Sequence, residues 1–178
     1  MATSGEATIP VFWDFSVHAI IARGSGTGDV LNVLVALQDL ILAEIPGSTS
    51  LGLPYNYSKD NVYEAVQDGA WLVQNYIEEY VASCGADAKI AVIGYSLGAC
   101  VMMEALCGTS SVGLWPVEAI DSTYANNGMA RVTSEYTGLD IRLITNLVIA
   151  VINYGDETNG LGQPWNVGNC TVGTGVSL

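Results

Sequence analysis

A serine between two glycines is the feature of this sequence with the clearest chemical potential. Residues 94–98 read Gly-Tyr-Ser-Leu-Gly, so Ser96 lies in a G-x-S-x-G pattern. Residues 89–93 before it fit a buried strand, and small residues after it fit the start of a helix. A sharp strand-to-helix turn exposes the serine hydroxyl as a nucleophile for acyl transfer. We interpret residues 94–98 as a nucleophile elbow; an ordinary strand–helix turn is the alternative, because the bare pattern is common by chance.

A second glycine-rich segment, residues 22–26 (Ala-Arg-Gly-Ser-Gly), follows another apolar strand. Ligands of open α/β sheets bind beyond the carboxyl ends of the strands, where this loop and the elbow both belong. Ser25 can offer its N–H and hydroxyl to a developing oxyanion, with the N–H of Leu97 as the other donor. A phosphate loop is disfavoured, because Asp29 stands where G-x-G-x-x-G needs glycine and no Gly-Lys-Ser/Thr follows.

The elements that must position these residues alternate between strands and helices. Continuously apolar segments predict strands, with a further brief strand at residues 50–54; the segments are residues 17–22, 89–94 and 147–154. Helix-length segments separate them, which indicates a parallel sheet covered on both faces. The predicted fold class is therefore α/β, a three-layer α/β/α sandwich with a central, mainly parallel sheet.

Helical spacing of apolar residues predicts three helices. One includes Leu31, Leu34 and Leu40 and ends at Pro46-Gly47. The second is a long helix that follows an N-cap at Ser58 and has Tyr80 on its inward face. The third covers residues 95–106. A weaker helix is predicted around residues 117–130, and a loop after Gly155.

Composition and charge exclude several classes of protein. The chain has 178 residues, 50% of them hydrophobic and 13% charged, and a formal net charge of -13. These values fit one globular domain and exclude a disordered chain. The five basic residues are scattered, so nucleic-acid binding is not expected. No apolar run is long enough for a membrane helix. We expect no metal site and no cofactor, because His18 is the one histidine and the cysteines lack ligand spacing.

Several motifs in order resemble the cutinase family, which includes cutinases and acetylxylan esterases. The motifs are Ala-Arg-Gly-Ser-Gly-Thr-Gly at 22–28, a long helix ending near Cys84, Gly-Tyr-Ser-Leu-Gly-Ala at 94–99, and Tyr-Gly-Asp-Glu followed by Gly-Gln-Pro-Trp-Asn-Val-Gly at 154–168. The resemblance spans residues 17–172. It implies a secreted, lidless serine esterase with a small α/β-hydrolase sheet. Ser96 would be the nucleophile, and Ser25 with the backbone of Leu97 would form the oxyanion hole.

The resemblance also shows where this sequence departs from the family. A serine hydroxyl needs a base, and His18 lies in the first predicted strand, some 15 Å or more from the site at about 3.3 Å per residue. In the family pattern the catalytic acid and base lie downstream of Gly168, and the sequence ends at Leu178. We therefore expect residues 1–178 to form a single cutinase-like domain without the family's last strand, catalytic Asp and His loops and final helix. Asp156 does not match the family's acid, and Asp121 and Asp140 match no family position.

The compartment and the partners stay open from the sequence. The amino-terminal residues do not read as a signal peptide, whereas two sequons (at Asn56 and Asn169) suit a secreted protein. Four cysteines permit three pairings, and Cys100 and Cys107 on one helix would be too far apart to pair. The strand at 147–154 would be an apolar sheet edge that a second chain, a dimer contact or the tail must cover.

Two functions are compatible with these observations. The first is an ester hydrolase that uses Ser96 on polyesters, short acyl esters or acetylated polysaccharide, with acid and base from outside this sequence. The second is a cutinase-like scaffold without hydrolysis that binds another small ligand or acts as an effector or immune-active module. The Ser96 and Ser25 motifs favour the first, and the absence of a base disfavours present catalysis by this sequence alone.

Overall fold

The computed structural model describes residues 16–26, 31–57, 62–108, 117–121, 123–124 and 147–156. Within these residues, four strands form one parallel sheet in the order β2-β1-β3-β4. The strands are β1 (His18–Ala22), β2 (Thr49–Gly52), β3 (Ile90–Tyr95) and β4 (Val148–Tyr154). Because the strands are parallel, their carboxyl ends lie at the same end of the sheet. The segments that follow β1, β3 and β4 therefore all leave from that end.

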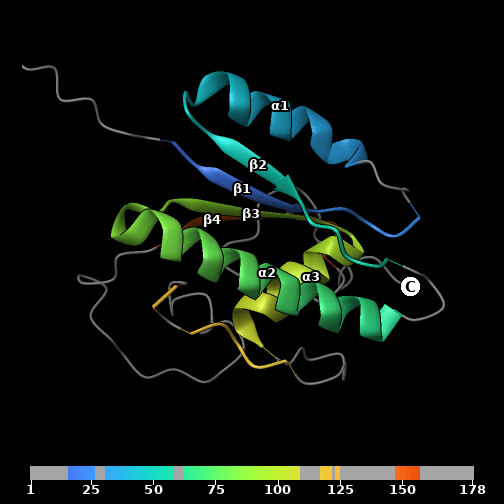
Figure 1. The fold of residues 1–178 in the computed structure, drawn as a ribbon. Coiled ribbons are helices and arrows are strands. Elements are labelled where there is room, and N and C mark those ends of the chain that lie inside the picture. Colours follow the sequence, from blue (N-terminus) through green and yellow to red (C-terminus); the bar gives the residue numbers. More distant parts are fainter. Residues whose placement is uncertain are drawn as a thin grey trace, which may run out of the picture.

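Helices cover both faces of the sheet, as Figure 1 shows. The helices are α1 (Val35–Glu44), α2 (Val62–Cys84) and α3 (Leu97–Cys107), with 3-10 turns η1 (Asn32–Leu34) and η3 (Gly85–Asp87). Helix α1 lies on one face and helices α2 and α3 lie on the other. The three-layer α/β/α prediction is confirmed. The boundaries of a single domain over residues 1–178 stay a prediction.

The hydrophobic core has two parts, one on each side of the sheet. The larger lies under α2 and α3 and includes Ile20, Val92 and Val101. The smaller lies under α1 and includes Ile21 and Ile93. Neighbouring residues of β1 and β3 thus point to opposite faces, and all are buried except His18 and Tyr95 at the strand ends, which explains why the buried parts of these strands are apolar.

The helix predictions need three corrections. Leu40 is 55% exposed, not inward; the apolar side chains of α1 that pack toward the sheet are Leu37 and Ile41. The long helix needs no correction, because α2 ends at Cys84, as predicted. Helix α3 begins at Leu97 instead of residue 95, because β3 continues to Tyr95. Residues 117–121 are irregular and 123–124 form a turn, so the weak helix predicted around residues 117–130 is wrong for these described residues. Ser58, residues 125–130 and the tail after Asp156 lie outside the described residues.

Strand β4 lies at one edge of the described sheet, as the sequence predicted. It pairs with β3, and no described strand pairs with its other side. Ile149 of this strand is 48% exposed. A second chain or dimer contact on this edge stays a prediction. In the described part of the chain, no helix is both long enough and apolar enough to cross a membrane.

Candidate active site

Ser96 is the single residue between strand β3 and helix α3, and its backbone is strained. Its φ is 52° and its ψ is -122°, and it is the one non-glycine residue with positive φ in the described ranges. Backbone strain of this kind costs about 1–3 kcal/mol and persists only where the surroundings enforce it. The Ser96 N–H donates to the carbonyl of Tyr154 at 2.8 Å, and its carbonyl accepts from Ala99 N–H at 2.8 Å. The elbow predicted from the sequence therefore has the expected local geometry.

The glycines on either side of the serine are required by close backbone contacts. An ideal Cβ on Gly98 would lie 2.2 Å from the carbonyl oxygen of Ala22, and one on Gly94 would lie 2.5 Å from Cα of Ala99. Both distances are far below ordinary contact. Any side chain at these positions would push helix α3 away from strands β1 and β3. The spacing of the G-x-S-x-G pattern thus follows from how closely the helix approaches the sheet.

The loop after β1 lies directly beside Ser96. An ideal Cβ on Gly24 would be 2.8 Å from the Tyr95 ring and 3.2 Å from Cβ of Ser96. Ser25 is half-buried next to this contact, and Gly26 turns the chain away with φ of 72°. Leu97 is the first residue of α3, so its N–H belongs to the open, electropositive end of the helix. The structure brings together the Gly24-Ser25 loop, Ser96 and Leu97; their catalytic roles stay predictions.

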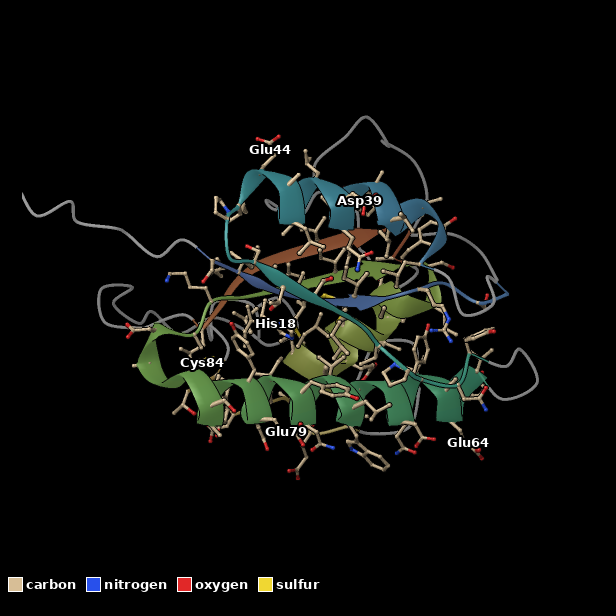
Figure 2. The ribbon with its side chains drawn as sticks, turned by 45° about the horizontal axis from the view of Figure 1, so that its top comes forward. His18, Asp39, Glu44, Glu64, Glu79 and Cys84 are labelled. Atoms are coloured by element: carbon tan, nitrogen blue, oxygen red, sulfur yellow. The ribbon has the colours of Figure 1, made fainter. Side chains whose placement is uncertain are left out.

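His18 lies at the opposite end of the sheet from Ser96. It pairs in register with Ile90, and five residues of β3 separate that position from Tyr95, about 16 Å at 3.3 Å per residue. Its ring stacks on Tyr80 with centroids 4.4 Å apart, and its Nδ1 lies 2.7 Å from Oγ1 of Thr49. Figure 2 shows it between the sheet and α2, toward the Cys84 end of that helix. Burial lowers the pKa of His18 from 6.5. These contacts tie His18 to α2 and β2, far from Ser96, as its place in the first predicted strand indicated.

The structure describes two of the three acidic residues considered from the sequence. Asp121 is exposed, and its carboxylate accepts the N–H of Thr123 at 2.8 Å, a bond that lowers the pKa of Asp121. This is a turn-stabilising contact. Asp156 is half-buried just beyond β4, and Asp140 lies outside the described residues. No group of three His, Cys, Asp or Glu side chains suited to a metal occurs among the residues that the structure describes.

Arg23 is the residue of this region whose role the sequence reasoning missed. Its side chain is 7% exposed, which is unusual for an arginine, and it bonds to the segment that follows β2. A signal was present in the sequence: a lone arginine stands between an apolar strand and a glycine loop, where a solvated cation has little room.

A parallel sheet with a strained serine between a strand and a helix is the architecture of α/β-hydrolase serine esterases. Comparison with known families specifies the class further. The cutinase family model matches residues 15–173, so the chain belongs to the cutinase family. It has the scaffold of a cutinase-like serine esterase, as the sequence motifs predicted.

Individual relatives agree with this assignment. The chain is 26% identical over 164 residues to an acetylxylan esterase of Hypocrea jecorina, and equally identical over the same length to cutinase 11 of Verticillium dahliae. The match covers 88% of this chain but 48% and 50% of those proteins. The chain thus spans about half the length of the curated relatives it matches. The fold matches the catalytic core domain of the acetyl xylan esterase from Trichoderma reesei with a TM-score of 0.66 at 24% identity, over 88% of this chain and 70% of that one.

Proposed function

We propose that this chain carries the nucleophile and oxyanion hole of a carboxylic ester hydrolase. Ser96 would attack the ester carbonyl carbon and form an acyl–serine bond. The alcohol would leave with the proton that Ser96 gives up, and water would then release the acid and regenerate the serine. The strained backbone of Ser96, held beside the Gly24-Ser25 loop, is the observation that carries this proposal.

Two residues beside Ser96 would bind the developing negative charge. Ser25 would offer its N–H and hydroxyl, and Leu97 would offer its N–H from the first turn of α3. Removing one donor of an oxyanion hole costs about 10²–10³ in kcat. The substrate would be an ester of the kind that the relatives' names indicate, an acetylated xylan or a cutin-like polyester.

The position of His18 favours a second candidate function. The one histidine of the sequence is engaged by Tyr80 and Thr49 far from Ser96, so the base would have to come from outside this sequence. Without such a base, the same scaffold would be a ligand-binding module with little hydrolysis. An enzyme that lacks a triad member keeps only about 10³–10⁴ of rate enhancement over water, from binding and the oxyanion hole.

Chemical rescue separates the two candidates. The purified chain and its Ser96→Ala variant are assayed with p-nitrophenyl acetate, with and without added imidazole. The esterase proposal predicts Ser96-dependent hydrolysis that imidazole stimulates and an acetyl group on Ser96 detected by mass spectrometry. Equal rates for the two proteins under both conditions would instead favour the binding module. Circular dichroism of both proteins shows whether the variant has kept its fold.

A location outside the cell is also proposed. It is supported by the membership in the cutinase family, since the family resemblance implies secretion, and by the sequon at Asn56, whose side chain is exposed after β2. Expression through a eukaryotic secretory pathway should give a glycan at this position, which Asn56→Gln would remove as a shift in mass. If the Asn56→Gln variant carried the same glycan mass as the wild type, Asn56 would not be the acceptor.

A further inference from the structure

Arg23 is a buried cation at the carboxyl end of β1, immediately before the Gly24-Ser25 loop. In the described part of the chain, Arg23 and Glu104 are the two charged residues that are buried, with 7% and 1% exposure. Charged side chains are rarely buried unless specific partners compensate for the loss of water. The partners that the structure gives to Arg23 therefore indicate what this residue does.

The guanidinium group of Arg23 binds the segment between β2 and α2. Nη1 donates to the carbonyl of Leu53 at 3.2 Å, and Nη2 donates to the carbonyl of Tyr55 at 3.4 Å. Its Cζ atom lies 4.2 Å from the centre of the Tyr57 ring and 5.7 Å from that of Tyr55. Two carbonyls and two aromatic rings thus hold one planar cation, a combination to which arginine is suited.

Tyr55 returns a hydrogen bond to the same residue. Its hydroxyl donates to the main-chain carbonyl of Arg23, while its ring is only 2% exposed. Burial raises the pKa of Tyr55 well above its usual value, so the hydroxyl keeps the proton that it donates. Side chain and main chain of Arg23 are therefore both fixed by the 53–57 segment. We call Arg23, Tyr55 and Tyr57 the arginine clamp.

The main chain that the clamp fixes is also in contact with the elbow. An ideal Cβ on Gly98 would lie 2.6 Å from the carbonyl oxygen of Arg23, so α3 packs directly on this peptide group. On the other side, Gly24 approaches Tyr95 and Cβ of Ser96. The Arg23 peptide thus lies between the Ser25 loop and the helix that begins directly after Ser96. A shift of this peptide would change the separation of the two.

We propose that Arg23 is a positioning residue, which acts through the arginine clamp to hold the Gly24-Ser25 backbone at a fixed place beside Ser96. The effect of Arg23 on the reaction rate rests on the proposed ester hydrolysis. Arg23 would act through the 53–57 segment that its side chain binds, not on a reacting atom. Its effect would be on preorganisation, because a donor displaced by about 1 Å can cost about 10²-fold in rate.

Three variants test the clamp. Arg23→Lys keeps the charge but loses the planar group that reaches two carbonyls and stacks on Tyr57. Tyr55→Phe keeps the ring and removes only the hydroxyl that bonds the Arg23 carbonyl. Thr49→Val is the matched control, because it removes a hydrogen bond to His18 at the other end of β1. Thermal unfolding of each shows how far overall stability has changed.

The primary measurement is the NMR order parameter of the Gly24 and Ser25 amides, which does not require turnover. A rigid backbone gives about 0.85 and a flexible one below about 0.6. We expect the first value in the wild type and in Thr49→Val, and values near or below 0.6 in Arg23→Lys and Tyr55→Phe. Amides of Val92 and Val73 in the core should stay rigid in all four proteins.

The second measurement is hydrolysis of p-nitrophenyl acetate. Loss of preorganisation predicts a kcat that is lower by about 10–100-fold with KM nearly unchanged, in Arg23→Lys and Tyr55→Phe only. If Ser96→Ala hydrolyses as fast as the wild type, the proposed function fails, and the order parameters still decide the clamp. A mobile Ser25 in the wild type would overturn the proposal. So would clamp variants in which Ser25 stays rigid while only the melting temperature falls.

Discussion

Replacing Gly98 with alanine tests how closely helix α3 must approach strand β1. The added Cβ would lie 2.2 Å from the carbonyl oxygen of Ala22, whereas ordinary van der Waals contact begins near 3.4 Å. The helix and the strand would have to separate by about 1.2 Å. The two nearest groups are main-chain carbonyls of Ala22 and Arg23, so no side chain can rotate away to relieve the contact.

Helix propensity alone would make Gly98→Ala raise the free energy of unfolding, whereas the backbone contact should lower it. Alanine inside a helix is favoured over glycine by about 0.8–1 kcal/mol. Overpacking a core costs about 1–3 kcal/mol, and contact with backbone belongs at the upper end. We expect Gly98→Ala to lower the free energy of unfolding by about 2 kcal/mol, which is the overpacking cost less the gain in helix propensity. For a chain of this length that corresponds to about 4–8 °C in the melting temperature.

Thermal unfolding followed by far-UV circular dichroism measures this effect. The matched control is Gly52→Ala in β2, where the nearest atom to the added Cβ is a side-chain carbon of Leu31 at 3.3 Å, which can move. Gly52→Ala should change the melting temperature by about 2 °C or less. A Gly98→Ala protein that melts at or above the wild-type temperature would refute the reasoning, because propensity would then outweigh the backbone contact.

Two further predictions concern Ser96 and His18. Ser96→Gly should raise the melting temperature by about 2–4 °C relative to Ser96→Ala, because glycine adopts φ of 52° without the strain that any Cβ brings; equal melting temperatures would contradict a strained elbow. Because burial lowers the pKa of His18 below 6.5, the unfolded chain binds its proton more readily. Stability from this residue should be complete above pH 6.5 and be lost as pH falls through the folded pKa, by at most about 1.4 kcal/mol per pH unit. Urea unfolding at pH 7.5 and 5.5 should show a smaller difference for His18→Gln than for the wild type; an unchanged difference would contradict this.

The local features of the fold could be predicted from the sequence alone. Continuous apolar runs predicted the two strands that end at the Ser25 loop and at the elbow. The runs are apolar because a strand buried on both faces has few positions for polar side chains. The G-x-S-x-G pattern located the turn at Ser96, because only glycine tolerates the contacts on either side of it. Counting residues along β1 was enough to place His18 far from the site. The outward position of Leu40 could not be predicted, because periodicity alone does not say which part of an apolar helix faces the sheet.

What only the tertiary structure decided are the contacts between segments distant in sequence. The Ser96 N–H reaches Tyr154 from a neighbouring strand, and the guanidinium of Arg23 reaches carbonyls about thirty residues along the chain. Neither contact leaves a periodic signal, because each depends on which strands lie side by side and on the path of the 53–57 segment. The serine and its glycines are written in the sequence. The strain on that serine and the clamp beside it exist only once the parallel sheet has brought β1, β3 and β4 together.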